Sequence, residues 1–206
     1  MAIQAVLTGD IVNSTRLGQA AEKKLMKCLQ QLLAAHRFEF YRGDSFQVFV
    51  KDARSALQTA LLCRTAAISI AGSAAVSSDI RISIGIGKTK TPVASLGIAR
   101  GEAFVLSGRA FDELTKTNTR LAMVGNNQLA NEGLQVIADY LNAIFKDMTG
   151  KQAGVIFELL NGETQQTVAA KLKKSKSTIH QHVSAGRWPA IENLLHHYEN
   201  IINQLI

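Results

Sequence analysis

The sequence has few cysteines and no hydrophobic segment long enough to cross a membrane. Its two cysteines, Cys28 and Cys63, lie inside apolar patterns typical of helices, without CxxC or Cys/His spacing. A disulfide framework and a structural zinc site are therefore disfavoured, and we expect both thiols in the core. No apolar run reaches the ~18 residues of a membrane span, and the first residues lack the features of a signal peptide. We expect a folded cytoplasmic protein with no membrane partner.

Composition points to a globular chain with a basic surface. Hydrophobic residues make up 47% and charged residues 19% of the 206 residues, enough apolar material for a sizeable core. The net charge of +7 is compatible with a polyanionic partner, nucleic acid or nucleotide, and equally with a solvated surface. The length fits one domain, or one domain with a small appendage.

Hydrophobic periodicity predicts the order βαββαβ followed by αβα in the first part of the chain. A turn at Arg42–Ser45, with Asp44 at its tip, predicts a β-hairpin, and Gly72 is expected to end a helix. Asn13, Ser14 or Thr15 is expected to cap the first helix. The predicted strands are 3–8, 38–40, 46–50, 80–86 and 120–124, and the predicted helices are 15–35, 53–71, 103–114 and 129–145; residues 88–101, with Pro92, form a basic loop.

No strand pattern follows residue 146, which suggests two domains, residues 1–146 and 147–206. The second is predicted to be all helical, with a helix at 152–160 and a final helix opened by Pro189. The apolar stripe of that final helix is typical of a core, and is also compatible with a dimer seam.

Residues 165–187 are predicted to form a helix-turn-helix. Val168, Ala169 and Leu172 precede the polar break 173–176, and Ile179 and Val183 follow it, so two short helices can cross closely. Lys173 occupies a position where many such turns have glycine, and Ser175 or Ser177 is expected to cap the second helix. DNA is the expected partner, and the alternative is a unit that packs on another protein or on its own twin. The residues expected to contact DNA are Lys176, Ser177, Thr178, His180 and Gln181 in the major groove, and Arg187 at phosphate.

Two aspartates are candidates for a metal site. Asp10 follows the first strand, and in a ferredoxin-like sheet that strand lies beside the third, which begins after Asp44. Paired carboxylates suit Mg²⁺ or Mn²⁺, and the helix start that follows Asp10 favours phosphate. The alternative is that both aspartates only cap turns or face solvent.

The segments Leu7–Thr15 and Gly43–Phe46 resemble the two metal-aspartate motifs of class III adenylate and guanylate cyclases. Ile82–Gly87 and Gly101–Arg109 continue the likeness in the same order. A closer resemblance is to the bacterial SatD-like family, whose members look like a minimal cyclase-type domain, in some followed by a helix-turn-helix. The resemblance implies an α+β fold, with a ferredoxin-like sheet of nucleotidyl-cyclase type and a small all-α helix-turn-helix domain.

The cyclase pattern, carried over by position, implies a set of site residues. It makes Asp10 and Asp44 ligands of Mg²⁺ or Mn²⁺, with a carbonyl from Ile11, and puts Arg109 in the place of the transition-state arginine. Val105 stands where cyclases have a ribose-orienting asparagine, a departure that argues against complete cyclase chemistry. Such sites form between two chains, so the resemblance implies a homodimer. The residues expected to contact nucleotide phosphates are Asn13, Ser14, Thr15 and Lys88.

Three functions remain open on these grounds. The first, which we favour, is a DNA-binding transcriptional regulator, not an enzyme, whose degenerate cyclase-like domain binds a metal-nucleotide, such as a nucleoside triphosphate, as a signal. The second is a Mg²⁺- or Mn²⁺-dependent nucleotidyl cyclase or small nucleotide polymerase, with the transition state stabilised by charge. The third is a non-catalytic dimerisation scaffold.

Overall fold

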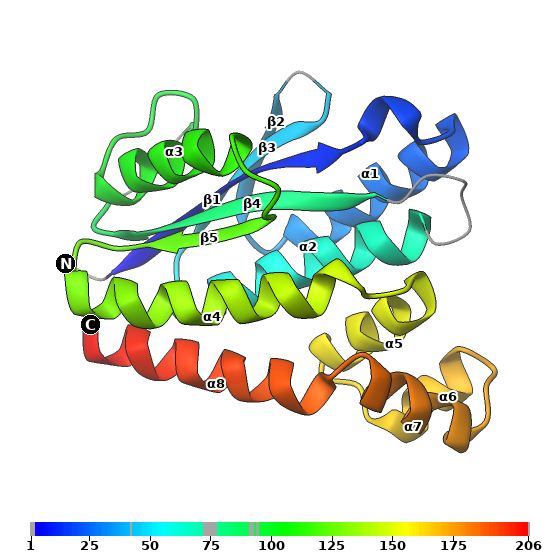
Figure 1. The fold of residues 1–206 in the computed structure, drawn as a ribbon. Coiled ribbons are helices and arrows are strands. Elements are labelled where there is room, and N and C mark those ends of the chain that lie inside the picture. Colours follow the sequence, from blue (N-terminus) through cyan, green and yellow to red (C-terminus); the bar gives the residue numbers. More distant parts are fainter. Residues whose placement is uncertain (1–2, 42, 72–77, 91–92, 94, 206) are drawn as a thin grey trace.

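The computed structural model describes residues 3–41, 43–71, 78–90, 93 and 95–205, and it follows the predicted order of elements (Figure 1). Arg42, Gly72 and Pro92, predicted to lie in turns or loops, are outside the described residues. The strands are β1 Gln4–Val12, β2 Arg37–Tyr41, β3 Ser45–Val50, β4 Asp79–Gly87 and β5 Leu121–Val124. The α-helices are α1 Gln19–Leu33, α2 Ala56–Ala71, α3 Glu102–Thr115, α4 Gln128–Lys146, α5 Gly150–Leu160, α6 Gln165–Lys171, α7 Lys176–Ala185 and α8 Trp188–Leu205.

The five strands form one sheet in the order β2-β3-β1-β4-β5. β1 is antiparallel to both neighbours, β3 and β4, and β2 is antiparallel to β3, which is the ferredoxin-like arrangement of a βαββαβ unit. β5 adds a parallel edge beside β4. The fold is therefore α+β, as predicted, and β1 lies next to β3.

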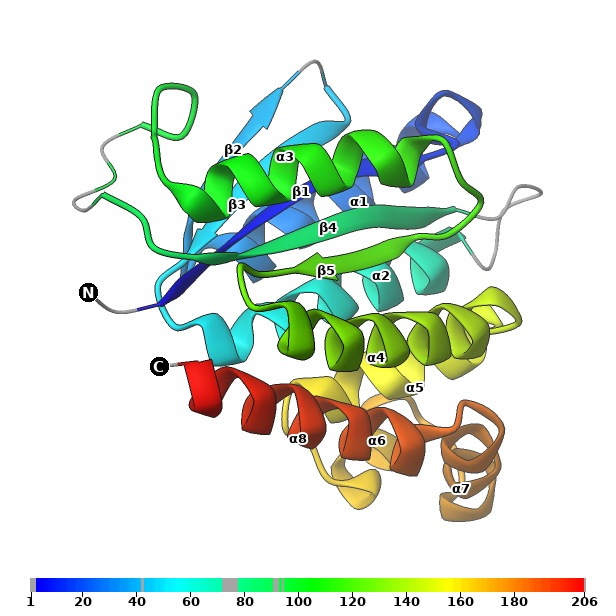
Figure 2. The same ribbon diagram turned by 60° about the vertical axis from the view of Figure 1, so that its left-hand side comes forward.

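Helices cover both faces of the sheet. α3 lies on one face, and α1, α2 and α4 lie on the other (Figure 2). Because successive side chains of a strand point to opposite faces, Ala5, Leu7 and Ile11 join the large core on the α2 side. Val6 joins a small cluster beneath α3, so Asp10, an even number of residues further on, lies on the same face as Val6.

The C-terminal helices share a core with the sheet layers. α5 packs against α2, and α8 runs beside α4 (Figures 1 and 2). Ile191, Tyr198 and Ile202 are fully buried, and the Tyr198 hydroxyl donates to the Ala53 carbonyl at 2.8 Å. The stripe of the final helix is therefore core, whereas the domain boundary after residue 146 stays a prediction.

The start of the first helix differs from the prediction. Asn13 adopts a left-handed conformation (φ 61°) and is followed by a short 3₁₀ helix, Ser14–Arg16, so that α1 begins only after Gly18. None of the three residues Asn13, Ser14 and Thr15 caps α1, and that prediction is wrong. The local cause is the turn at Asn13, a residue type that tolerates positive φ. No helix in the described part of the chain is both long enough and apolar enough to span a bilayer.

The buried thiol of Cys63 gives a prediction for alkaline pH. Burial raises its pKa from 9.0 to about 12. Between these values the unfolded chain releases a proton that the folded chain retains, so this group's contribution to stability is complete below pH 9 and is lost as pH rises toward 12. The free energy of unfolding should fall by about 1.4 kcal/mol per pH unit from this group. Denaturant titrations at a series of pH values between 9 and 12 should therefore show that the free energy of unfolding falls less steeply with pH for Cys63→Ala than for wild type.

Cys28→Ala is the matched control, since Cys28 is half-buried and the charge of Lys24 opposes the rise of its pKa. Cys28→Ala should reduce the pH dependence of the free energy of unfolding less than Cys63→Ala does. Identical slopes for Cys63→Ala and wild type would contradict the prediction.

Candidate functional site

The structure brings Asp10 and Asp44 to the same end of the sheet. Asp10 pairs with Ser45 across β1 and β3, and the Ile11 N–H donates to the Asp44 carbonyl at 3.0 Å. Because the N–H and C=O of one residue in an antiparallel strand point to the same side, the Ile11 carbonyl also faces β3. The three predicted metal-binding residues are therefore neighbours.

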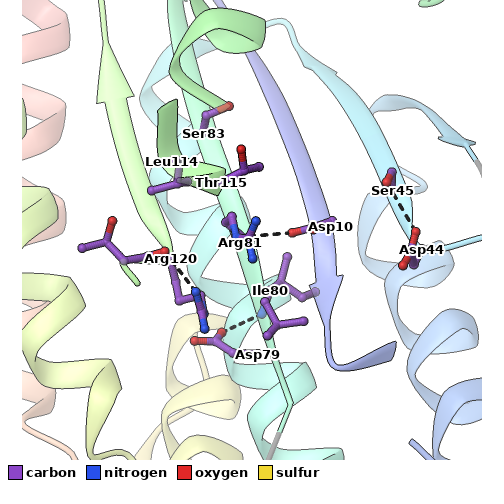
Figure 3. Close-up of polar contacts among 12 residues, drawn as sticks. Asp10, Asp44, Ser45, Asp79, Ile80, Arg81, Ser83, Leu114, Thr115 and Arg120 are labelled. Carbon is purple, nitrogen blue, oxygen red and sulfur yellow. Dashed lines mark hydrogen bonds and ion pairs between the residues drawn. The ribbon is translucent and has the colours of Figure 1, made fainter. Parts of the chain in front are cut away.

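Two serines hold the Asp44 carboxylate. Ser14 Oγ donates to Asp44 Oδ2 at 2.8 Å. Ser45 Oγ donates to Asp44 Oδ1 at 3.4 Å (Figure 3). Ser14 belongs to the 3₁₀ helix that follows β1, so this bond ties the β1–α1 connection to the hairpin tip. Asn13 and Thr15, also predicted to contact phosphate, are exposed beside Ser14.

Asp10 lies against an arginine that the sequence analysis did not single out. Arg81 pairs with Asp10 across β1 and β4, and its Nε is 3.8 Å from Asp10 Oδ1, too far for a hydrogen bond. Both atoms are buried without a hydrogen-bond partner among the described residues. Burial raises the pKa of Asp10; Arg81 opposes this rise and the charge of Asp44 adds to it.

Arg81 belongs to a row of charges at this end of the sheet. It lies between Asp10 and Arg120, which immediately precedes β5 (Figure 3). Asp79, two residues before Arg81, receives two hydrogen bonds from Arg64 of α2, at 3.1 and 2.7 Å. The sequence could have indicated Arg81, because this residue alternates with the buried isoleucines of β4 and must therefore face the other side of the sheet. No local pattern connects it with Arg64 and Arg120, which belong to other parts of the chain.

α3 ends above this row of charges. Thr8 Oγ1 and Ser107 Oγ are 2.7 Å apart, and Ser83 Oγ donates to the Ser107 carbonyl at 2.8 Å. These buried bonds fix α3 across β1 and β4. Leu114 and Thr115, at the end of α3, lie close to Arg81 (Figure 3).

The strand pairing contradicts the prediction that Lys88 contacts nucleotide phosphates beside Asp10. Lys88 follows Gly87, which pairs with Gln4 at the start of β1, whereas Asp10 pairs with Arg81 at the other end. Six residues of strand separate Gln4 from Asp10, about 20 Å. Within one chain Lys88 cannot join a phosphate site at Asp10, because β4 runs antiparallel to β1.

Arg109 is not brought to the aspartates within one chain. It is exposed on α3, one turn after Val105, which is 50% exposed. No hydrogen bond or ion pair links Arg109 to Asp10 or Asp44 among the described residues. Its predicted role therefore needs a second chain.

α6 and α7 present the residues predicted to contact DNA. Val168 and Ala169 of α6, and Ile179 and Val183 of α7, are buried, and Lys173 takes a left-handed conformation (φ 51°) in the turn between the helices. Ser175 caps α7 by accepting from the Thr178 N–H at 3.1 Å. The predicted DNA-contacting side chains other than Thr178, which is half-buried, are exposed: Lys176, Ser177, His180, Gln181 and Arg187.

Two solved structures are similar to part of this chain. Both are described as a bacterial light-regulated adenylyl cyclase. The first has a TM-score of 0.41 and 13% identity, over 59% of this chain and 75% of that chain. The second has a TM-score of 0.39 and 13% identity, over 59% of this chain and 43% of that chain. No protein-family model and no curated protein matches the sequence.

The donor set at Asp10 and Asp44 fits a hard divalent cation. Two carboxylates and a backbone carbonyl are the oxygen ligands that Mg²⁺ and Mn²⁺ prefer, and the Asp10 oxygen without a hydrogen-bond partner is available to such an ion. The described residues contain no cluster of three or more His, Cys, Asp or Glu side chains. The protein would therefore supply only part of a coordination shell, and a phosphate-bearing ligand and water would supply the rest.

Proposed function

We propose that the protein is a DNA-binding regulator that responds to a metal-bound nucleotide. The α6–α7 unit is the observation that carries this proposal. Residues 164–191 contain five Lys or Arg and no Asp or Glu, and they form two short helices that cross through a tight turn. A basic unit of this geometry is typical of a helix-turn-helix.

α7 has the dimensions and surface of a recognition helix. Its ten residues extend about 15 Å, and the major groove, about 12 Å wide, accommodates a helix. Ile179 and Val183 hold one side of α7 on the neighbouring helices. The other side exposes His180 and Gln181, whose donors and acceptors suit base edges.

Lysines around the turn supply the phosphate contacts. Lys173, Lys174 and Lys176 are exposed and form no ion pair among the described residues. Lys171, by contrast, is paired with Glu158 and Glu163, at 2.7 and 3.1 Å. The three unpaired lysines are therefore available to a polyanion.

The aspartate pair is the proposed sensor. Asp10 and Asp44, with Ile11, would hold Mg²⁺ or Mn²⁺, and the ion would neutralise the phosphates of a nucleoside triphosphate. Ser14 fixes Asp44, so ligand binding at Asp44 also orders the β1–α1 connection. The shared core of α2 and α5 gives a physical connection from the sheet to the α6–α7 unit.

The DNA part is tested by removing two phosphate-contacting charges. We expect Lys174→Ala/Lys176→Ala to weaken binding to a labelled 30-base-pair duplex roughly tenfold or more. The negative slope of log affinity against log salt concentration should become less steep by about 2, because two phosphate contacts are lost. Fluorescence anisotropy at several salt concentrations measures both quantities.

Lys51→Ala is the control, since Lys51 is exposed after β3, at the other end of the sheet from Asp10. It should leave affinity and slope near those of wild type. Salt-independent binding, or equal losses in the control and the double variant, would refute the DNA-binding proposal. In that case a dimer that binds neither DNA nor nucleotide would indicate the scaffold function.

A nucleotidyl cyclase or small nucleotide polymerase is the second candidate, favoured by the contact between the Asp10 strand and the Asp44 turn. Here the same metal site would position a nucleoside triphosphate for phosphoryl transfer, with Arg109 of a second chain adding positive charge. This function predicts pyrophosphate release with Mg²⁺ or Mn²⁺. No release from any of the four ribonucleotides with either metal would exclude it.

A further inference from the structure

A pocket lies beside the aspartate pair, and neither Asp10 nor Asp44 lines it. Its volume is about 470 Å³, within the usual range for small-molecule sites. It lies where the ends of α2 and α4 meet the strand ends of β1, β4 and β5. Its lining includes Arg64, Arg120, Lys146, Asp79, Phe145 and Met148.

Cations outnumber anions in this pocket. Arg64 is neutralised by Asp79, which it contacts at 2.7 Å. Arg120 and Lys146 have no carboxylate partner within the described residues. Burial lowers the pKa of Arg120 and the positive charge of Arg81 lowers it further, whereas the charges of Asp79 and Asp10 oppose this change. The lining of the pocket therefore contains three cations and one carboxylate, a net charge of +2.

Arg64 has a donor that nothing in the described chain satisfies. Its side chain is 1% exposed, and its Nε and Nη2 both donate to Asp79. Its Nη1 is buried and has no hydrogen-bond partner. A buried donor on a charged group is unfavourable unless it is paired, so this atom points to a missing acceptor.

Apolar groups form the remaining wall. The Arg64 guanidinium carbon lies 4.4 Å from the centre of the Phe145 ring, which fixes the guanidinium at the pocket wall. Met148, Ile68 and Val12 also line the pocket. A bare inorganic ion would leave this apolar surface exposed to water.

We propose that this pocket binds a small organic oxyanion, a phosphate ester or a carboxylate, whose charged end meets Arg64 and Arg120 and whose apolar end lies against Phe145 and Met148. Guanidinium groups suit both kinds of oxyanion because they offer paired donors. The pocket lies at the α4–α5 connection, through which the sheet region joins the helical tail. Its occupant would be an effector separate from the nucleotide of the aspartate pair.

Calorimetric titration of the full chain with phenyl phosphate, benzoate and inorganic phosphate tests this proposal. The protein is first freed of metal and then exchanged into a buffer without chelator, because a chelator such as EDTA is itself an organic carboxylate, and because without a metal the aspartate pair repels anions. We expect phenyl phosphate to bind more tightly than inorganic phosphate, and Arg120→Gln to weaken phenyl phosphate binding roughly tenfold or more. Tighter binding of phenyl phosphate than of benzoate assigns a phosphate ester, and the reverse assigns a carboxylate; either supports the pocket.

Three variants make the result specific. Lys146→Gln removes an exposed charge of the pocket without disturbing the core, and should also weaken binding. Arg100→Gln removes an exposed charge elsewhere and should have no effect. Asp10→Asn/Asp44→Asn should retain binding, which separates this pocket from the proposed nucleotide sensor. Absence of saturable binding up to about 10 mM, or equal binding by Arg120→Gln and wild type, would overturn the proposal.

Discussion

Replacing Gly85 with alanine is expected to destabilise the protein by about 3 kcal/mol or more. Gly85 lies in β4 directly beneath α3, and a Cβ atom at this position would clash with the Ala103 carbonyl oxygen and the Ser107 amide nitrogen. Both are backbone atoms, so a change of side-chain rotamer cannot relieve the contact. Ser107 is also tied to Thr8 and Ser83, which prevents α3 from moving away from the sheet.

Gly108→Ala is the matched control, one residue beyond Ser107. A Cβ atom there meets nothing within 4 Å, so alanine should stabilise α3 by about 0.5 to 1 kcal/mol. Chemical denaturation of the two variants and wild type measures the difference. A Gly85→Ala protein as stable as wild type would show that α3 does not pack this closely on β4.

Loss of the aspartate pair should abolish metal-dependent nucleotide binding. We expect calorimetry with Mn²⁺ and ATP or GTP to show binding to wild type, and Asp10→Asn/Asp44→Asn to weaken it more than about a hundredfold. Asparagine keeps the size of each side chain and an oxygen that can accept from Ser14, but it removes the negative charges that attract a cation. The loss would therefore report on charge and not on packing.

Asp139→Asn provides the control, because Asp139 is exposed on α4 and makes only a local bond with Gln135. This variant should bind like wild type. Metal-dependent binding confined to proteins that keep both aspartates would leave sensing and catalysis to be separated by pyrophosphate release. If wild type binds neither nucleotide with Mn²⁺, the aspartate pair is no nucleotide sensor, and the DNA-binding unit alone remains to be tested.

The sequence predicted the elements well where the signal was local. Alternating isoleucines placed β4, and the turn at Gly43 and Asp44 placed the β2–β3 hairpin, because a strand with one face on a core needs period-two hydrophobicity. The first helix was placed too early. The left-handed turn at Asn13 delays it, and nothing in the apolar pattern signals that conformation.

Contacts between segments distant in the sequence were harder to predict. Arg64, Asp79 and Arg120 come from three elements, and only the packing of α2 against the end of the sheet brings the first two into contact. Lys88 was misplaced because it is close to the motif residues in sequence order, whereas the antiparallel direction of β4 takes it to the opposite end of β1.

By itself the sequence determined the order of strands and helices, the hairpin with Asp44 at its tip, and the polar residues of α7, because each follows from periodicity and turn chemistry over a few residues. The tertiary structure alone decided that Arg81 faces Asp10, that the Arg64 donor is left unpaired in a cationic pocket, and that the stripe of α8 is core. These features depend on strand register and on packing between distant segments, which no short window of sequence specifies.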